Sequence, residues 1–497
     1  MRWNTVAQRL TLLAALTLAG CTVGPRYQRP DLASPPAFVE AAATPRTAGP
    51  AAEQDLSRWW TRFGDPTLND LIARALADNP DLQVAASRVR EARLQVRIAA
   101  AAESPSLSAS GNDIGYNSDR KSPATGSGAA GGTSSKTGLA GVPIPSHLSL
   151  YSAGFDASWE VDLFGGTRRS IEQAKASAEA AEWSRRDGQV SLTAEVANDY
   201  LMLRGLQARI ALGQAELARQ QSLFSLIQAR RASGFVTSLD VNQQSVQVAT
   251  AAAQIPQLDA QARGMIHALG VLVGQPPEAL FTQLAPPADP TALAPQPPDL
   301  PVGLPSELLR RRPDLRQAER QLAAANANIG VQEASLYPKL NLIGLASFAG
   351  TSLDSLFNNN NFSTLGVGML SQPLFNAGKS RATIAQAKEE HTQALITYRA
   401  TVLGAFRDLE DDLARYQAEE IRRVSLVRSV EAAGGSDQIA RDQYRVGLVT
   451  YINVLQSENA RLNAEDQLIQ SDSQALSDLV ALYKALGGGW TDAAATR

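Results

Sequence analysis

The stretch Tyr151–Leu163, YSAGFDASWEVDL, alternates without a break between apolar and polar side chains. Its odd-numbered positions are apolar or aromatic, and its even-numbered positions are Ser, Gly, Asp or Glu. Because side chains alternate between the two faces of a strand, the pattern predicts a β-strand with one apolar face and one face carrying Asp156, Glu160 and Asp162. Transmembrane strands of about 9 to 11 residues have this composition, with lipid on one side and water on the other. A strand of a soluble sandwich is the alternative, although such a strand rarely needs this length.

An unusually long helix is predicted after this strand and again later in the chain. Segments 167–233 and 379–446 contain no proline, and as helices each would extend about 100 Å. Apolar residues recur at helical spacing in the first segment and, in part, in the second, which indicates a seam for lateral packing in a coiled coil or helical barrel. Each segment ends at a glycine turn, and a helix of about half the length is expected to return. The seam residues are Leu192, Val196, Tyr200, Leu203, Leu206, Ile210 and Leu217, then Leu409, Leu413 and Tyr416.

Short motifs recur along the chain at fixed offsets and indicate a tandem duplication. NPDL at 79–82 returns as RPDL at 312–315, an offset of 233 in residue number. GFVTSLDV at 234–241 returns as GLVTYINV at 447–454, an offset of 213. The offset falls by 20, so the first copy carries an insertion of about that size between these motifs. The Gly/Ser/Thr-rich run 112–146 accounts for it and is expected to be an exposed loop.

The second copy offers weaker strand signals at 340–349 and 362–375. In the latter, Leu365, Val367 and Met369 share one face, and two glycines lie on the other. Two strands per copy and two copies give four strands per chain. Because lipid cannot satisfy an open strand edge, these strands must close into a barrel with other subunits.

The N-terminus has the pattern of a lipoprotein signal. Arg2 and Arg9 flank a short charged start, Leu10–Ala19 is apolar, and Leu18-Ala19-Gly20-Cys21 follows. Ten apolar residues are too few to span a bilayer but fit the core of a secretory signal. LAGC resembles a lipobox, which predicts cleavage after residue 20 and acylation of Cys21. An ordinary signal peptide followed by a chance Cys is the alternative. Thr22 in place of Asp favours the outer membrane.

Composition excludes several other classes of function. The chain has 46 Lys+Arg against 49 Asp+Glu, a net charge of −3, so no basic excess is available for nucleic acid. One Cys and three dispersed His give no disulfide framework and no metal-ligand pair. The match to G-x-G-x-x-G at 126–131 lacks a preceding strand and a following helix, so it predicts no phosphate site. Carboxylate pairs such as Asp411-Asp412 are expected on a solvated helix face.

Together these features resemble the TolC-like outer-membrane factors of tripartite efflux pumps, in particular the lipidated branch called the NodT family. The resemblance covers nearly the whole mature chain. The motifs that carry it are CTVGP at 21–25 with Tyr27 and Pro30, Trp59-Trp60, FGDP at 63–66, LFGG at 163–166, RRRPDL at 310–315, PLFNAG at 373–378, YRVG at 444–447 and YKALGGGW at 483–490.

The resemblance implies an α+β membrane protein. It would be a homotrimer whose twelve-stranded transmembrane β-barrel takes four strands from each protomer and continues into a long periplasmic α-helical barrel. The protein would be a passive exit channel of an RND-type efflux pump for small toxic compounds, not an enzyme. Its partners would be a periplasmic adaptor, an inner-membrane transporter and outer-membrane lipid. No cofactor is expected beyond the covalent lipid on Cys21, which would anchor the chain in the outer membrane. A type I protein secretion duct or a structural envelope lipoprotein are the alternatives; an envelope hydrolase lacks a nucleophile and base.

The expected divisions of the chain follow from these signals. They are a signal peptide at 1–20, a lipidated extended segment at 21–65, a first repeat at 66–273, a Pro-rich inter-repeat segment at 274–305, a second repeat at 306–486 and a tail at 487–497.

Two sites are expected at the glycine turns. The turns resemble adaptor-contacting turns of the family, although the glycines could serve only as helix caps; the turn residues are Gly234, Val236, Thr237, Gly447, Leu448 and Val449. In some relatives two carboxylates, at the sixth and ninth positions beyond the second glycine, ring the closed pore. Here those positions are Asn453 and Gln456, with Tyr451 and Arg445 near enough in sequence to assist. The alternative is that these side chains face another helix.

Overall fold

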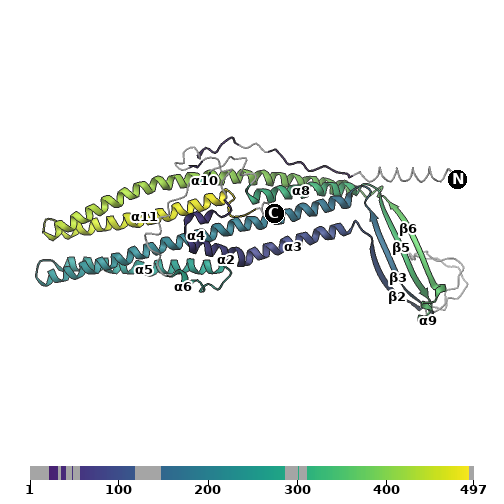
Figure 1. The fold of residues 1–497 in the computed structure, drawn as a ribbon, viewed down its shortest axis with the longest axis horizontal. Helices are drawn as coiled ribbons and strands as arrows, with labels where there is room; N and C mark the ends of the chain where they lie inside the picture. The colour runs from purple at the N-terminus through teal and green to yellow at the C-terminus, as the bar shows by residue number, and fades with distance from the viewer. Residues whose placement is uncertain are drawn as a thin grey trace, which may run out of the picture. The chain divides into compact units, whose positions relative to one another are not determined.

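A computed structural model of the chain describes residues 22–31, 35–40, 47–48, 56–117, 147–285, 300–301 and 311–491. Within them the main helices and strands, labelled in Figure 1, are α2 (Pro66–Asp78), α3 (Pro80–Ala101), β2 (Ser106–Asn117), β3 (His147–Val161), α4 (Gly166–Ala232), α5 (Ser238–Leu272), α8 (Pro313–Ala334), β5 (Lys339–Gly350), β6 (Phe362–Ser371), α10 (Lys379–Arg445) and α11 (Tyr451–Ala485). Short elements complete the description: η3 (Trp59–Phe63), α6 (Phe281–Leu284), α9 (Leu353–Leu356), η5 (Asn359–Asn361), and β1 (Thr47–Ala48) paired with β4 (Leu300–Pro301).

The bounds of these elements confirm the tandem duplication. Helix α3 and strand β2 recur as α8 and β5, with equal lengths and at the offset of 233. Helices α4 and α5 recur as α10 and α11 at the offset of 213. The long helices have 67 residues each, close to the proline-free segments that predicted them, and the return helices have 35, about half that length as expected. Most of the loop predicted at 112–146 lies outside the described residues, but its start, up to Asn117, extends β2.

The chain divides into two units that cut across the repeats. Unit 1 comprises residues 1–27, 93–175 and 323–391, and unit 2 comprises the remaining residues. Each copy contributes to both units, because α3, α4, α8 and α10 each run from one unit into the other.

Unit 1 is built on one antiparallel sheet in the order β2-β3-β5-β6, visible in Figure 1. Asp156 of β3 pairs with Ser108 of β2 on one side and with Leu345 of β5 on the other. The face of β3 that carries Asp156 is polar along this strand, as predicted. On β6, however, Val367 pairs with Ile343, and Met369 with Asn341, on the face that carries Asp156 and Glu160. The simple division into an apolar and a polar face therefore fails for this half of the sheet, because register, not composition, decides the face.

The core of unit 2 holds the aromatic motifs of both chain ends. Trp59 of η3 stacks on Tyr483 of α11 with ring centroids 4.9 Å apart. Trp60 and Phe63 are buried beside it, as are Leu68, Leu71 and Ile72 of α2. The predicted seam is buried at Leu192, Val196, Tyr200 and Leu203 and at Leu409, Leu413 and Tyr416, whereas Leu206, Ile210 and Leu217 are half-buried in the single chain.

Two glycines after the return helices show how each copy closes on itself. Gly274 and Gly487 are equivalent by the offset of 213, and both have a φ of 72°. A Cβ on Gly274 would lie 2.4 Å from the Asp78 carbonyl oxygen, and one on Gly487 would lie 3.1 Å from the Arg312 Cα. Each glycine therefore fits tightly against the helix break of its own copy, just before the proline that opens α3 or α8.

Among the described residues, no helix contains a stretch long and apolar enough to cross a bilayer.

Candidate functional site

The two glycine turns lie where the sequence places them, at the ends of α4 and α10. Gly234 has a φ of 77° and Gly447 a φ of 80°, the left-handed conformation that ends a helix without strain in glycine. Thr237 caps α5 and forms a capping box with Asp240. Backbone hydrogen bonds from Gly234, Phe235, Gly447 and Leu448 to the preceding helix turn hold the start of both turns.

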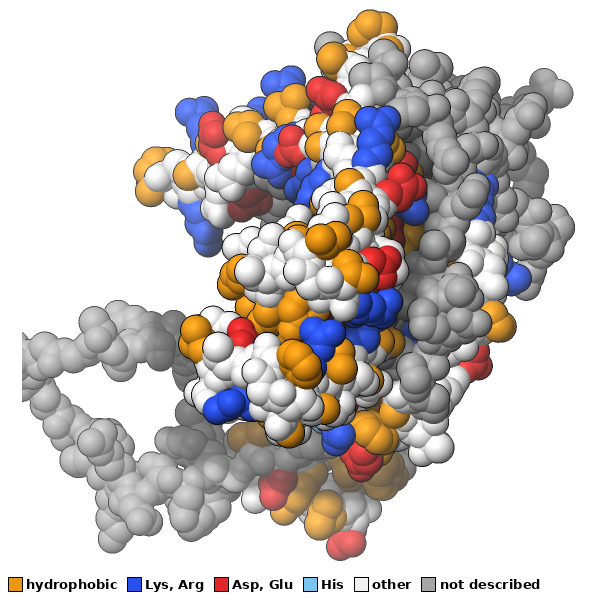
Figure 2. Space-filling view, turned by 90° about the vertical axis from the view of Figure 1, so that its left-hand side faces the viewer, with side chains coloured by type: hydrophobic (Ala, Val, Ile, Leu, Met, Phe, Trp, Pro, Cys, Tyr) orange, Lys and Arg blue, Asp and Glu red, His pale blue; other side chains and the backbone are white. Residues whose placement is uncertain are grey.

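Large apolar side chains project from both turns. Phe235 is 82% exposed and Leu448 is 75% exposed, and they occupy equivalent positions, each directly after its glycine. Val236 and Val449, also predicted as contact residues, are only half-buried. Figure 2 views the molecule from the side on which the two turns lie in Figure 1, and apolar side chains are interleaved there with basic ones. Phe235 is not among the turn residues predicted from the sequence, because a single exposed aromatic residue gives no periodic signal. The sequence does align Phe235 with Leu448, and that alignment could have identified it.

The helical hairpin α4–α5 and the helical hairpin α10–α11 are joined near their turns. The Tyr451 hydroxyl, at the start of α11, hydrogen-bonds the Gln244 side-chain oxygen on α5. The Arg230 guanidinium lies 4.9 Å from the ring centroid of Tyr444. Burial is the main reason that the pKa of Tyr451 is raised, with nearby Glu458 adding to it. Tyr451 is therefore a neutral hydrogen-bonding link between the copies at every physiological pH.

The other three residues predicted at the aperture are exposed in the single protomer. Asn453 and Gln456 are exposed on α11 of the single protomer, and Asn453 accepts a hydrogen bond from Thr450 Oγ1 at 3.0 Å. Arg445 is exposed and pairs with Asp442 at 3.0 Å, one turn back on its own helix. Tyr451 is therefore buried within the protomer, whereas Asn453, Gln456 and Arg445 lie on its surface.

A buried charge network ties the hairpins together farther from the turns. Arg461 on α11 binds Glu216 of α4 at 3.0 Å, Asp437 of α10 at 3.1 Å and Glu465 at 2.7 Å. Arg441 of α10 binds Glu458 at 2.6 Å. Burial, followed by repulsion from Glu216, raises the pKa of Glu458.

The expectation that carboxylate pairs such as Asp411-Asp412 lie on a solvated helix face is wrong for Asp412, and the carboxylates of the charge network are buried as well. Glu216, Asp437 and Glu458 are buried, and so is Asp412 beside exposed Asp411. Asp412 accepts a hydrogen bond from the Arg415 guanidinium, while burial raises the pKa of Asp412. Helices that pack side by side enclose whichever side chains lie at their contact, so a charged sequence does not by itself mark a solvent face.

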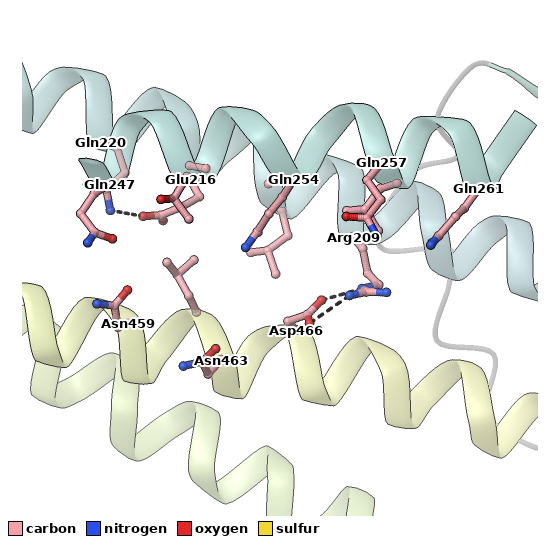
Figure 3. Close-up of a pocket in the computed structure, with 16 residues that line it drawn as sticks. Arg209, Glu216, Gln220, Gln247, Gln254, Gln257, Gln261, Asn459, Asn463 and Asp466 are labelled. Atoms are coloured by element: carbon pink, nitrogen blue, oxygen red, sulfur yellow. Dashed lines mark hydrogen bonds and ion pairs between the residues drawn. The ribbon is translucent and has the colours of Figure 1, made fainter. Parts of the chain in front are cut away.

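Beside this network lies a polar cavity of about 370 Å³ between α4, α5 and α11 (Figure 3). Amide side chains dominate its lining, and an Arg209–Asp466 ion pair at 2.6 Å joins α4 to α11 there. The amides are Gln220 of α4, Gln247, Gln254, Gln257 and Gln261 of α5, and Asn459 and Asn463 of α11. Its walls are consistent with a polar groove between helical hairpins rather than with a catalytic centre.

The residues that follow the predicted lipid site are held tightly in unit 1. Cys21 itself lies outside the described residues, but Thr22 is its covalent neighbour. Val23 N donates to Phe164 O at 3.1 Å, and the buried Arg169 guanidinium donates to Val23 O at 3.0 Å and Gly24 O at 2.9 Å. We call this arrangement of residues 22–24 with Phe164 and Arg169 the N-terminal clasp.

Glycine makes the clasp possible. Gly24 has a φ of 92°, and a Cβ on it would lie 2.4 Å from the Cα of Gly330 on α8. A Cβ on Gly165 would lie 2.7 Å from the Thr22 side chain. The CTVGP and LFGG motifs therefore meet in space, a contact that the sequence alone did not predict.

The four-stranded sheet and the long paired helices recur in solved outer-membrane channels, which gives the class of protein: an outer-membrane channel. The chain belongs to the outer membrane efflux protein family, whose model matches residues 71–275 and 304–488.

Relatives and solved structures agree along nearly the whole chain. It is 34% identical to the pyoverdine export outer membrane protein OpmQ of Pseudomonas aeruginosa over 97% of both chains, and 29% identical to nodulation protein T of Rhizobium leguminosarum bv. trifolii, again over 97% of both. Its fold is similar to that of the outer-membrane channel OprN, with a TM-score of 0.84 and 34% identity over 95% of this chain and 100% of that one.

These findings confirm the resemblance and the α+β fold of a trimeric outer-membrane channel with a periplasmic helical part. They also confirm that the protein is an efflux channel and a passive conduit, not an enzyme. The expected divisions of the chain, the lipid on Cys21 and the roles of the individual site residues stay predictions.

Proposed function

We propose that this channel is the exit duct of a tripartite pump, receiving small toxic compounds from a periplasmic adaptor and an RND-type inner-membrane transporter. The equivalent exposed pair Phe235 and Leu448 carries the proposal. Exposed apolar side chains of this size, set among charged residues, are typical of surfaces that bind another protein. Relatives of this chain are named for the export of pyoverdine and the efflux of toluene, which favours small cargo over secreted proteins.

The adaptor contact can be tested by crosslinking in cells. Cysteine at Phe235 or Leu448 should crosslink to an adaptor that carries cysteine at the tip of its helical hairpin, and Val236→Cys or Val449→Cys should do so more weakly. Cysteine at exposed Leu353, beside β5 and remote from the turns in sequence, is the matched control. Crosslinking at Leu353 with none at Phe235 or Leu448 would show that the adaptor does not use the turns.

The function itself is tested by deletion. Loss of the chain should raise susceptibility to small toxic compounds, and Phe235→Asp with Leu448→Asp should reproduce this while the protein still migrates as a heat-modifiable trimer. Loss of a secreted protein with unchanged susceptibility would instead favour a type I secretion duct. Unchanged susceptibility and secretion would favour a purely structural lipoprotein.

The same proposal includes a lipid anchor at Cys21. The N-terminal clasp supports it, because adjacent Cα atoms are about 3.8 Å apart and Thr22 is held against unit 1 beside Phe164 and Gly165. Phe164 stacks on Tyr337 at 4.7 Å where the strands join the helices, as aromatic residues do at a membrane interface. Acyl chains on Cys21 would then enter the membrane beside the sheet, each buried methylene adding about 0.8 kcal/mol.

Mass spectrometry of the purified mature protein decides this point. The expected N-terminal residue is a Cys21 bearing lipid, and Cys21→Ser should lose labelled fatty acid and leave the signal uncleaved or cut elsewhere. An unmodified Cys21, or a mature start upstream of it, would disprove the anchor without affecting the channel.

A further inference from the structure

One face of the unit 1 sheet carries most of the charges of its strands. Directly paired residues of antiparallel strands lie on the same face, so Asp156 of β3 shares a face with Ser108 of β2 and Leu345 of β5. Glu160 lies on that face as well and binds Lys339 of β5 at 2.9 Å. Because ionised side chains are costly against lipid, this face lines the water-filled lumen of the trimeric barrel. We call it the lumen face.

The opposite face has the composition expected against lipid. In the described strands, Asp113 is the one acidic or basic residue on it, near the end of β2 that is distant from α3. Charge and composition therefore assign the two faces in the same way. The apolar and aromatic residues of this opposite face include Leu107, Phe155, Trp159, Leu342, Phe348 and Phe362.

The duplication allows the lumen face of the two strand hairpins to be compared position by position. Strand β2 corresponds to β5 by the shift of 233 seen in their bounds. The pair Ser106 and Ser158 of the first hairpin recurs as Lys339 and Ser371 of the second, so β3 corresponds to β6 by a shift of 213. Each pair of the second hairpin therefore has an equivalent in the first.

This comparison shows that the lumen face is polar in the first copy and apolar in the second. Leu345 pairs with Leu365 on this face, whereas the equivalent residues of the first copy, Asn112 and Ser152, pair in the same way and are polar. Both copies form the same hairpin, so strand pairing does not require apolar residues here. Three further positions change in the same direction: Ser110, Gly154 and Asp156 of the first copy are Ile343, Val367 and Met369 in the second.

The apolar residues form one continuous surface, which we call the apolar track: Ile343, Leu345, Leu365, Val367 and Met369. Val367 pairs with Ile343 directly beside the pair of Leu365 with Leu345. Leu365 is 56% exposed and Met369 50% exposed in the protomer. Single exposed apolar residues are common, but a contiguous group on the wall of a water-filled pore is not. Cargo leaving through the barrel passes over this surface.

We propose that the apolar track is a transit site that binds small uncharged solutes with an apolar surface as they leave through the barrel. Contact with the track takes apolar surface of such a solute out of water, whereas ions and polar solutes are served by the polar lumen face of the first copy. The track itself carries no charge, so it offers no attraction to an ion. This inference rests on the proposed export of small compounds and narrows their chemistry.

The assignment of the faces is tested by thiol labelling of the full-length protein in outer membranes. A membrane-impermeant maleimide should label Leu365→Cys from the water of the lumen and should not label Phe155→Cys on the opposite face. The wild type, with Cys21 alone, gives the background. Labelling of Phe155→Cys without Leu365→Cys would place the track against lipid, and an unreactive Leu365→Cys in a heat-modifiable trimer would show that a segment of this chain covers the track. Either result would overturn the proposal.

A reciprocal exchange of pairs tests the binding itself. Leu345→Asn with Leu365→Ser gives the second hairpin the polar pair of the first copy, and Asn112→Leu with Ser152→Leu gives the first hairpin the apolar pair of the second. Outer membranes are illuminated with trifluoromethylphenyldiazirine, an uncharged aromatic photoreagent, and the labelled residues are mapped by mass spectrometry. Relative to labelling of Phe155 on the lipid face, labelling of the β5–β6 lumen face should fall at least about threefold in the first variant. Labelling of the β2–β3 lumen face should rise by a similar factor in the second.

Controls and contrary outcomes are specific to the track. Leu345→Ile with Leu365→Ile keeps the surface apolar and should label as the wild type does. Wild-type labelling of the β5–β6 lumen face no stronger than that of the β2–β3 lumen face would overturn the proposal, as would equal patterns in both exchange variants. The second variant keeps the test decisive if the first does not assemble. Photolabelling needs neither adaptor nor transporter, so its failure is distinguished from a failure of the proposed pump, which shows as unchanged susceptibility on deletion.

Discussion

The Arg461 guanidinium on α11 lies 3.0 Å from the Glu216 carboxylate on α4 and joins the last helix of the second copy to the long helix of the first. Both side chains are buried. Arg461 also binds Asp437 at 3.1 Å, so one cation neutralises carboxylates from two other helices.

Replacing Arg461 should therefore be costly. Arg461→Met would leave Glu216 and Asp437 buried without this cation, a change that typically costs about 3–5 kcal/mol. We expect the helical circular dichroism signal to be lost at a clearly lower temperature. Arg407→Met is the matched control, because Arg407 is exposed and pairs with the exposed carboxylates of Asp408 and Asp411 on its own helix, interactions that contribute little to stability because water screens them. Equal thermal shifts in the two variants would contradict this role.

Glu458 should make stability depend on pH. Its folded-state pKa is raised by burial and by Glu216, so its contribution to stability is fully present below the unfolded-state pKa and is lost as the pH rises through the folded-state pKa. Glu458→Gln removes the charge, although it weakens the bond to Arg441. We expect the variant to melt above the wild type at neutral pH and the difference to shrink on acidification. Glu465→Gln is the control, because Glu465 is a more exposed partner of Arg461, and it should not raise the melting temperature. If the difference in melting temperature between Glu458→Gln and the wild type did not change with pH, Glu458 would not be the source of the pH dependence.

The aperture prediction concerns Asn453 and Gln456, both exposed on α11. Three protomers would present amides rather than up to six carboxylates, so a trivalent cation should find little attraction at the pore end. We expect weak block of single-channel current by such cations. Asn453→Asp with Gln456→Asp should make the block strong from the periplasmic side, and equal block in both proteins would show that these positions do not line the aperture.

The N-terminal clasp should depend on Arg169. Arg169→Ala removes the donors to the carbonyls of Val23 and Gly24, and hydrogen bonds to charged groups contribute about 1.5–3 kcal/mol each. Limited trypsin digestion should cut after Arg26 at least about tenfold faster in this variant. Arg168→Ala is the control, because Arg168 binds Asp162 instead. Unchanged cleavage in Arg169→Ala would show that the other contacts hold the segment alone.

The two closing glycines give a graded stability test. Gly274→Ala forces a Cβ into the Asp78 carbonyl and a positive φ onto alanine, so it should cost at least about 1–3 kcal/mol. Gly487→Ala should also destabilise, with a looser contact at Arg312. Gly264→Ala, in the interior of α5 with no atom within 4 Å of its Cβ, should be neutral or stabilising in thermal denaturation. If Gly264→Ala destabilised the protein as much as Gly274→Ala, the close contact of Gly274 with Asp78 would not explain the effect.

Local sequence patterns were enough to predict the helices, the strands and their duplication. Proline-free length, the two glycine turns and period-two alternation are local properties, so the bounds of the 67-residue helices could be predicted to within about one residue, and the strand that contains Tyr151 to within a few. The internal offsets determined the repeat for the same reason, since they compare the chain with itself.

Only the tertiary structure decided which side chains meet. Long-range strand pairing set the face of Val367, which composition had left open. Helix packing buried Glu216 and Asp412, although charged segments are usually solvated. The clasp brings Gly24 to Gly330, far away in the second copy, and no local pattern encodes such a contact. Burial and register arise from the summed packing of distant segments, whereas helix and strand propensity act over a few residues.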